Sequence, residues 1–345
     1  MPREPGWWYR EQGLAAYALA PVANIYGAVA ARRLVNSTPY RARIPVICIG
    51  NFTAGGSGKT PMAALLVETL KARGERPAVL SRGYGGSVRG AHWVNVNEDT
   101  AERVGDEPLL LAQIAPVMVA RDRTAGARAI EAKGEATVIV MDDGLQNPGL
   151  AKDLSLAVID SARGFGNWQV IPAGPMRLPL AVQAKLVDGI VFNGPVNVHF
   201  KDEMERLVPV LQMNAWLQGD WIGAGRYVAY AGIGNPARFF ETARSLGATL
   251  VEAVSFPDHA RYTGADANRL LALANSHGAK LLTTAKDHVR LTGSDSMRAL
   301  AAASTVLPVR MKLHDDGAKV LNGMLEGIMA KRLTKGSDPQ GQTPV

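Results

Sequence analysis

The sequence predicts an α/β protein: a parallel sheet with helices on both faces, a smaller second α/β domain and an N-terminal apolar helix. Apolar runs of strand length alternate with helical segments, which is the pattern of a parallel sheet covered on both faces. One run, residues 44–51, leads into a glycine-rich loop, and another, 136–141, ends in two aspartates. The chain has 345 residues, of which 47% are hydrophobic, and this is enough for one large or two ordinary domains with a packed core.

The N-terminal region predicts a membrane-associated helix within residues 1–35. Residues 13–31 contain no charged side chain. Aromatic and basic residues flank this run: Trp7, Trp8, Tyr9, Arg10, Arg32 and Arg33. Such flanks are typical of elements at a bilayer interface. The run approaches the length of a span, but Pro21, Asn24 and its many alanines favour a helix that lies in or dips into the interface. The alternative is a helix packed on the protein's own core.

The loop after the first predicted strand has the sequence pattern of a phosphate-binding loop. Glycines let backbone N–H groups converge on phosphate oxygens, Lys59 can reach the β and γ phosphates, and the Thr60 hydroxyl can bind Mg²⁺. A helix over residues 62–73 would add its N-terminal dipole. A nucleoside triphosphate with Mg²⁺ is therefore the predicted ligand. One position departs from the full pattern, which has glycine where this chain has Thr53. The alternative interpretation is therefore a glycine-rich turn that binds no phosphate. The predicted nucleotide contacts are Thr53, Ala54, Gly55, Gly56, Ser57, Gly58, Lys59 and Thr60.

Further strands and helices follow in the same rhythm. Strands are predicted at 77–81, 116–120, 136–141, 154–160 and 189–192, with a helix over 124–132. The alternation of strands and helices is interrupted at 218–221, after which a predicted strand at 226–232 leads to a predicted helix at 236–246. The predicted domains are a phosphate-loop domain at 36–221, to which 310–333 return, and a second, smaller domain at 222–309. The tail 334–345 has the composition of a disordered segment.

Carboxylates follow the predicted strands at the edge where sites form in parallel sheets. Asp142 and Asp143 stand where a magnesium-organising carboxylate stands in phosphate-loop enzymes, although an Asp-Asp-Gly triplet is also a turn. Asp106 and Glu107 precede Pro108 and an apolar helix. By themselves they predict a helix N-terminus, with Asp106 as the cap.

The net charge narrows the class of partner. A formal charge of +7 indicates an anionic partner: a nucleic acid, a phospholipid surface or a phosphorylated substrate. Because no aromatic-rich RNA-binding signature, zinc-finger spacing or basic heptad region is present, we predict no nucleic-acid partner. Cys48 is the only cysteine, which excludes an intramolecular disulfide.

A set of motifs spread along most of the chain resembles the tetraacyldisaccharide 4'-kinases, the lipid A 4'-kinases. The motifs are GGSGKTP at 55–61, LSRGYGG at 80–86, GDEP at 105–108, DDG at 142–144, PAGP at 172–175, GIGNP at 232–236, FPDH at 256–259 and TTAKD at 283–287. The resemblance implies ATP-dependent phosphorylation of the 4'-hydroxyl of tetraacyldisaccharide 1-phosphate, at the cytoplasmic face of the inner membrane, by a monotopic or peripheral enzyme. It implies no required protein partner.

The resemblance also implies roles for individual residues. Asp106 would be the general base, assisted by His259, and Lys59 would stabilise the transferring phosphoryl group. Thr60 with Asp142 or Asp143 would hold Mg²⁺. Further candidates for metal, phosphate or substrate contacts are Glu107, Arg123 and Arg177. Two positions depart from the family pattern: Leu145-Gln146-Asn147 follows Gly144 where the family has Phe-Gln-His, and Leu178 follows Arg177 where glutamate is common. Roles that belong to those missing side chains do not carry over.

Two other functions are consistent with a phosphate loop beside an apolar helix. A membrane-associated P-loop ATPase switch is the main alternative, but such proteins usually carry a lysine just before the glycine pair, where this chain has Ala54. A soluble small-metabolite kinase is the other, and the N-terminal apolar run argues against it.

Overall fold

The computed structural model describes residues 4–335, and within them the strands form two sheets. The larger sheet has nine strands in the order β13-β8-β7-β6-β1-β5-β2-β4-β3. Its strands are β1 Val46–Gly50, β2 Pro77–Ser81, β3 His92–Trp93, β4 Val117–Val119, β5 Val138–Asp142, β6 Leu154–Asp160, β7 Gly189–Asn193, β8 Leu211–Gly219 and β13 Val309–Leu313. The predicted parallel sheet is confirmed for the strands from β8 to β4, while β3 and β13 add antiparallel edges.

The central strand β1 lies between β5 and β6, and all five of its residues are buried. Strands buried on both faces read as continuous apolar runs. Because β1 and β5 are parallel neighbours, with Ile49 opposite Asp142, the loop after β1 and the aspartates after β5 emerge at the same edge.

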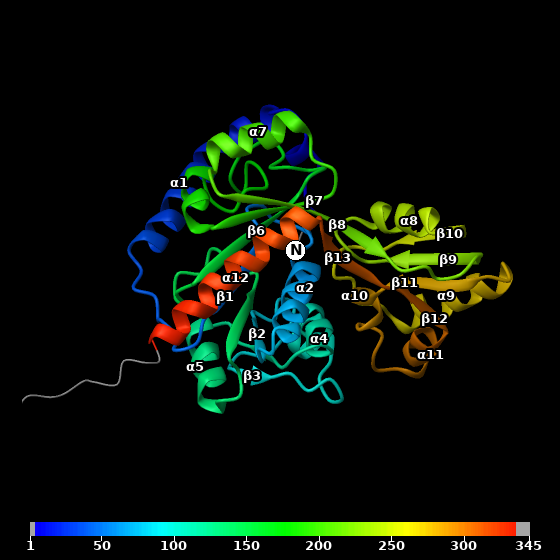
Figure 1. Cartoon of the computed structure of the whole chain (residues 1–345). Helices are drawn as coiled ribbons and strands as arrows, with labels where there is room; N and C mark the ends of the chain where they lie inside the picture. Colours follow the sequence, from blue (N-terminus) through cyan, green and yellow to red (C-terminus); the bar gives the residue numbers. More distant parts are fainter. Residues whose placement is uncertain (1–3, 336–345) are drawn as a thin grey trace, which may run out of the picture.

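Helices cover both faces of the larger sheet (Figure 1). One face packs against α2 and α12 through Leu66, Leu70 and Leu325, and the other against α5 and α7 through Ile130 and Met204. The helices of this part are α2 Lys59–Ala72, α3 Ala101–Val104, α4 Asp106–Ala112, α5 Arg123–Lys133, α6 Leu180–Gln183, η2 Ala184–Leu186, α7 Val198–Leu207 and α12 Asp315–Lys335. The predicted tail 334–345 begins inside α12, and its remaining residues lie outside the described residues.

The smaller sheet has the strand order β10-β9-β11-β12, and its paired strands are parallel. Helix α8 packs on one face through Phe239 and Phe240, while α9 and α11 pack on the other through Leu270 and Leu300. Its elements are β9 Gly225–Ala231, α8 Pro236–Ser245, β10 Ala248–Ser255, α9 Gly264–Ser276, β11 Lys280–Thr284, α10 Ala285–His288, α11 Asp295–Ala303 and β12 Ser304–Leu307. Figure 1 shows this unit beside the β8 and β13 edge of the larger sheet.

The chain crosses between the two sheets twice, from β8 to β9 and from β12 to β13. We propose these crossings as the boundaries between two domains, 36–221 with 310–333 and 222–309.

The N-terminal segment lies on the outside of the larger domain (Figure 1). A short 3-10 helix, η1 Gly6–Tyr9, is held by Trp8, whose Nε1 donates to Pro172 O at 3.1 Å. It leads to α1 Leu14–Val35, which within residues 4–335 is the one helix long and apolar enough to cross a membrane. Only 17% of its most apolar stretch is buried. Its large apolar residues that are exposed are Leu14, Tyr17, Val22, Ile25, Tyr26, Val29 and Val35.

Candidate active site

The predicted phosphate loop connects β1 to α2 and is shaped by glycines. Gly55 and Gly58 have φ angles of +92° and +99°, a conformation that disfavours any side chain. A Cβ at Gly58 would also lie 2.7 Å from the Asn193 amide nitrogen. Gly58 is the N-cap of α2, and no described side chain caps the first N–H groups of that helix. These N–H groups are therefore available to an anion.

Polar side chains around this loop are buried and incompletely paired. Lys59 Nζ donates to Gly55 O at 3.2 Å, within the loop itself. Burial lowers the pKa of Lys59, and the nearby Asp143 carboxylate opposes that shift. Among the described residues, Asn51 Oδ1 and Ser57 Oγ are buried without a hydrogen-bond partner. A ligand with several oxygen and hydrogen-bonding groups would satisfy such a loop.

The two aspartates after β5 have different environments. Asp143, at a φ of +50°, forms a bidentate ion pair with Arg177, at 2.7 and 3.0 Å. Arg177 Nε also donates to Thr53 O at 3.1 Å and so ties Asp143 to the phosphate loop. Burial opposes ionisation of Asp143, but the charges of Lys59 and Arg177 outweigh it and hold its pKa below the usual range. Asp143 is thus an engaged carboxylate.

Asp142, by contrast, is buried and unpaired. Its exposed fraction is 1%, and neither carboxylate oxygen has a hydrogen-bond partner within residues 4–335. Burial raises the pKa of Asp142 to about 7, and the negative charges of Glu107 and Asp143 add to the shift. An unpaired buried carboxylate is costly unless a proton or a cation neutralises it. Asp142 is therefore the member of the pair that is open to a metal ion.

Glu107 connects the phosphate loop to the smaller domain. Its Oε1 accepts from Thr60 Oγ1 at 3.0 Å and from Lys286 Nζ at 2.5 Å. Burial opposes its ionisation, but Lys286 and Lys59 hold the pKa of Glu107 below the usual range. Among the described residues no group of three or more His, Cys, Asp or Glu side chains is arranged to hold a metal ion.

Asp106 is the first residue of α4 rather than its N-cap, which is Gly105 with a φ of +93°. The predicted cap is therefore wrong in position. Asp106 Oδ1 accepts from the Glu107 N–H at 2.9 Å, while Oδ2 lies 3.2 Å from His259 Nδ1 and also contacts Arg290. Burial opposes ionisation, but the His259 hydrogen bond and the charge of Arg290 hold the pKa of Asp106 below its usual range. The same hydrogen bond raises the pKa of His259.

Arg123 is buried beside the aspartate pair but forms no ion pair with the described residues. Its Nη1 donates to Ala120 O at 2.6 Å, and burial lowers its pKa to about 10, against the opposing charges of Asp142 and Asp143. The structure thus connects Lys59, Thr60, Glu107, Asp142, Asp143, Arg177, Asp106 and His259 through hydrogen bonds, ion pairs and nearby charges, and Arg123 lies close enough to Asp142 and Asp143 for their charges to act on it.

Sequence reasoning missed three basic residues. Lys286 and Arg290 contact Glu107 and Asp106, but only the TTAKD motif before Arg290 gave any signal. Arg163 follows β6 and lies beside the phosphate loop, where it pairs with Glu4 at 3.3 Å. No sequence pattern pointed to it.

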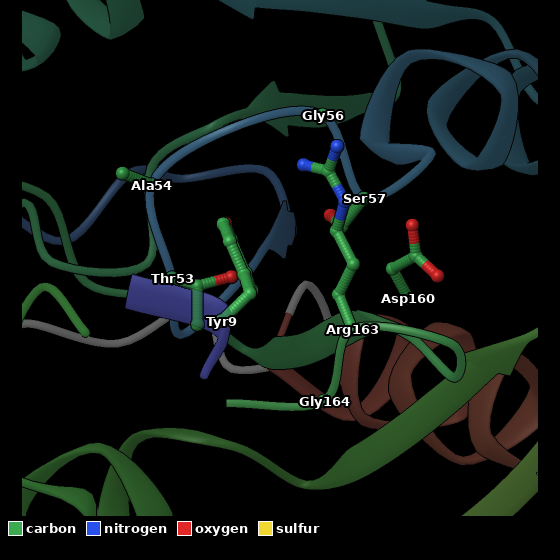
Figure 2. A pocket seen from close by; sticks show the side chains of 8 residues that line it. All are labelled: Tyr9, Thr53, Ala54, Gly56, Ser57, Asp160, Arg163 and Gly164. Atoms are coloured by element: carbon green, nitrogen blue, oxygen red, sulfur yellow. The ribbon is translucent and has the colours of Figure 1, made fainter. Parts of the chain in front are cut away.

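Figure 2 shows the guanidinium of Arg163 directed toward the phosphate loop across a small cavity. The cavity, of about 10 Å³, has room for about one water molecule. Its lining residues are Tyr9, Thr53, Ala54, Gly56, Ser57, Asp160, Arg163 and Gly164. The N-terminal segment thus packs against the outer side of the loop.

Comparison with known proteins identifies the family. The family model described as tetraacyldisaccharide-1-P 4'-kinase matches residues 15–326. A tetraacyldisaccharide 4'-kinase of Methylorubrum extorquens is 50% identical over 82% of this chain and 88% of that protein. One of Rhodopseudomonas palustris is 44% identical over 97% of each. The crystal structure of LpxK from Aquifex aeolicus, determined in complex with ATP, covers 91% of this chain and 99% of that one at 24% identity, with a TM-score of 0.72, and shows the same fold. The chain belongs to the tetraacyldisaccharide-1-phosphate 4'-kinase family.

Proposed function

We propose that this protein transfers the γ-phosphate of ATP to the 4'-hydroxyl of tetraacyldisaccharide 1-phosphate, a step of lipid A biosynthesis. Its family supports this function. Within the molecule, the proposal is supported by the Asp106–His259 pair, which joins the two domains with 3.2 Å between Oδ2 and Nδ1, while the adjacent Glu107 accepts a hydrogen bond from Thr60 at the phosphate loop.

Each residue of the proposed site has its own role in phosphoryl transfer. The loop 53–60 binds the ATP phosphates through its backbone N–H groups, and Lys59 leaves Gly55 O to stabilise the transferring phosphoryl group. Asp106, kept ionised, accepts a hydrogen bond from the acceptor hydroxyl and orients it. A carboxylate with a depressed pKa is a weak base, so it takes the proton as the hydroxyl oxygen bonds to phosphorus and becomes acidic. His259 stabilises Asp106, and Arg123 supplies further positive charge.

The residues present also fit a magnesium ion. Asp142 offers two unpaired buried oxygens, and Thr60 offers its hydroxyl, whereas Asp143 is engaged by Arg177 and Glu107 by Lys286. We propose that Asp142 and Thr60 hold the ion, with Glu107 as a further candidate ligand that would first have to leave Lys286. When bound, Mg²⁺ neutralises charge on the phosphates.

Asp142→Asn tests this metal assignment without relying on activity alone. Because its pKa rises from 3.8 to about 7 on folding, Asp142 binds a proton in the native state that the unfolded chain releases. The contribution of Asp142 to the free energy of unfolding of the metal-free protein should therefore fall as pH rises from about 4 to 7 and then level off. The variant should lose this dependence and should be stabilised less by Mg²⁺ in thermal melts. Turnover should fall by about 100-fold or more.

Asp143→Asn is the matched comparison, since Asp143 is already paired with Arg177. It should lose stability at neutral pH and keep the Mg²⁺-dependent rise in Tm. If the two variants exchange these behaviours, the metal is assigned to the wrong aspartate.

We propose that α1 attaches the enzyme to the cytoplasmic face of the inner membrane as a monotopic or peripheral element, with no nucleic-acid partner and no required protein partner. A substrate with four acyl chains leaves a bilayer at a cost of about 0.8 kcal/mol per exposed CH₂ group, so the enzyme must work at the membrane. The mostly exposed apolar surface of α1 and the positive net charge suit an anionic lipid surface.

The triple variant Val22→Ser, Ile25→Ser, Val29→Ser should weaken binding to anionic vesicles by about tenfold or more, because it removes apolar side chains that would enter the interface. Vesicle co-sedimentation measures this. Val198→Ser on α7 is the control, since Val198 and Ile25 are both 68% exposed. Equal vesicle binding by wild type and the triple variant would contradict the role of α1.

The function is tested against the ATPase switch by following both products of ATP turnover. A kinase should form phospholipid and ADP in equal amounts and should release almost no free phosphate without acceptor. A switch should instead hydrolyse ATP without the lipid and respond to a protein partner.

A further inference from the structure

Two neighbouring carboxylates of the larger domain each meet a cation from the smaller one. Asp106 contacts Arg290 and Glu107 contacts Lys286, and these cations stand four residues apart, at α10 and just beyond it. Arg290 and Asp106 are separated by 184 residues in the chain. The proposed base is therefore held from both domains.

The Arg290 guanidinium is itself held by the interior of the smaller domain. Its Nη1 donates to Gly232 O at 2.7 Å and to Asp287 Oδ1 at 3.0 Å. Asp287, which is fully buried, also accepts from the Gly232 N–H at 2.9 Å and from the Tyr262 hydroxyl at 2.8 Å. The side chain of Arg290 is only 7% exposed. Its position is thus set before any substrate binds.

Arg290 also fixes how Asp106 is oriented. Its Nε, at 3.1 Å, and its Nη2 both donate to Oδ2, the oxygen that faces His259. The Glu107 N–H holds the other oxygen. The carboxylate plane is therefore set by groups on two sides, and rotation about its bond to Cβ would break at least one of these contacts. A buried charge pair alone is weak evidence for added stability, because desolvation offsets the attraction.

We propose that Arg290 is a positioning residue for phosphoryl transfer, which holds the Asp106 carboxylate in the orientation that the acceptor hydroxyl requires. This inference rests on the proposed role of Asp106. A misplacement of about 1 Å can reduce the rate of a positioned reaction by about 100-fold. The effect of Arg290 should therefore appear in kcat and should depend on Asp106.

The test is a double-mutant cycle of Arg290→Gln and Asp106→Asn, with phospholipid formation measured at saturating ATP. We expect Arg290→Gln to lower kcat by about 10- to 100-fold, with the KM for ATP changed by less than about threefold. In the Asp106→Asn background the same substitution should have almost no further effect on kcat. Arg298→Gln is the control, since Arg298 lies in the same domain but is largely exposed.

Two further variants test whether Arg290 has only a structural role. Arg290→Ala should recover part of its kcat in added guanidinium at concentrations too low to denature the protein. Arg290→Lys keeps the positive charge but not the planar guanidinium with its several N–H donors. This variant should fold and should have a lower kcat than wild type. Additive losses in the cycle, or an Arg290→Lys variant with wild-type kcat, would overturn the inference. Absence of phospholipid from the wild type would instead overturn the proposed function.

Discussion

Replacing Asp106 with asparagine should reduce kcat for phosphoryl transfer by about 100- to 10,000-fold and leave ATP binding nearly unchanged. Asparagine keeps the size of the side chain but cannot accept the proton of the acceptor hydroxyl. It also weakens the contacts with His259 and Arg290 that fix the side chain. The measurement is single-turnover transfer of labelled phosphate at saturating ATP, together with the Kd for ATP.

Asp99→Asn is the matched control for Asp106→Asn. Asp99 is a buried aspartate that pairs with a histidine, His92, at 2.8 Å and with Arg103 at 3.2 Å, but it lies away from the phosphate loop. Its replacement should lower the free energy of unfolding and leave kcat within about threefold of wild type. An Asp106→Asn variant with nearly normal kcat would show that Asp106 is not the base.

Lys59→Ala should reduce phospholipid formation by about 100- to 1000-fold, because it removes a positive charge aimed at the transferring phosphate inside a buried site. The charge of Lys59 also lowers the pKa values of Asp142 and Asp143, so the substitution should raise the pKa of Asp142 further and bring that of Asp143 back toward its usual range. Unlike Asp106→Asn, it should weaken ATP binding as well. Both quantities come from the same labelled-ATP experiments.

Lys71→Ala serves as the control for Lys59→Ala. Lys71 is on the same helix, but it is exposed and donates to Ile114 O at the far end. It should bind ATP and turn over normally. If Lys59→Ala retained turnover within about threefold of wild type, the loop would have some role other than phosphoryl transfer.

The sequence predicts the centre of the larger sheet well because those strands are buried on both faces. The predicted strands 77–81 and 154–160 have the observed bounds, and the predicted loop from β1 to α2 is confirmed in place. Strand β8, between β7 and the edge strand β13, has only two buried residues, Met213 and Ala215, and has no such signal. Its antiparallel pairing with β13 joins segments almost 100 residues apart, which no local pattern encodes.

The candidate site was predictable where its residues are adjacent in sequence and not where they meet in space. The sequence of residues 55–60 by itself indicates a nucleotide-binding loop, and the Asp142-Asp143 pair by itself indicates a metal site. Which of the two aspartates stays unpaired depends on the guanidinium group of Arg177, which pairs with Asp143 from 34 residues away in the chain. Likewise, the contact of Arg290 with Asp106 exists only because α10 of the smaller domain packs against α4 of the larger one. Asp106 therefore looks like a helix cap in sequence and like a held carboxylate in the structure.

The proposed kinase activity is tested most directly by transfer of labelled γ-phosphate from ATP to tetraacyldisaccharide 1-phosphate in detergent micelles, with the position of the new phosphate determined by mass spectrometry. Wild type, Lys59→Ala and Asp106→Asn are compared in the same micelles. Wild type should place label on the 4' position, and either variant should place almost none. Free labelled phosphate without labelled lipid, or equal labelling by Asp106→Asn, would contradict this proposal.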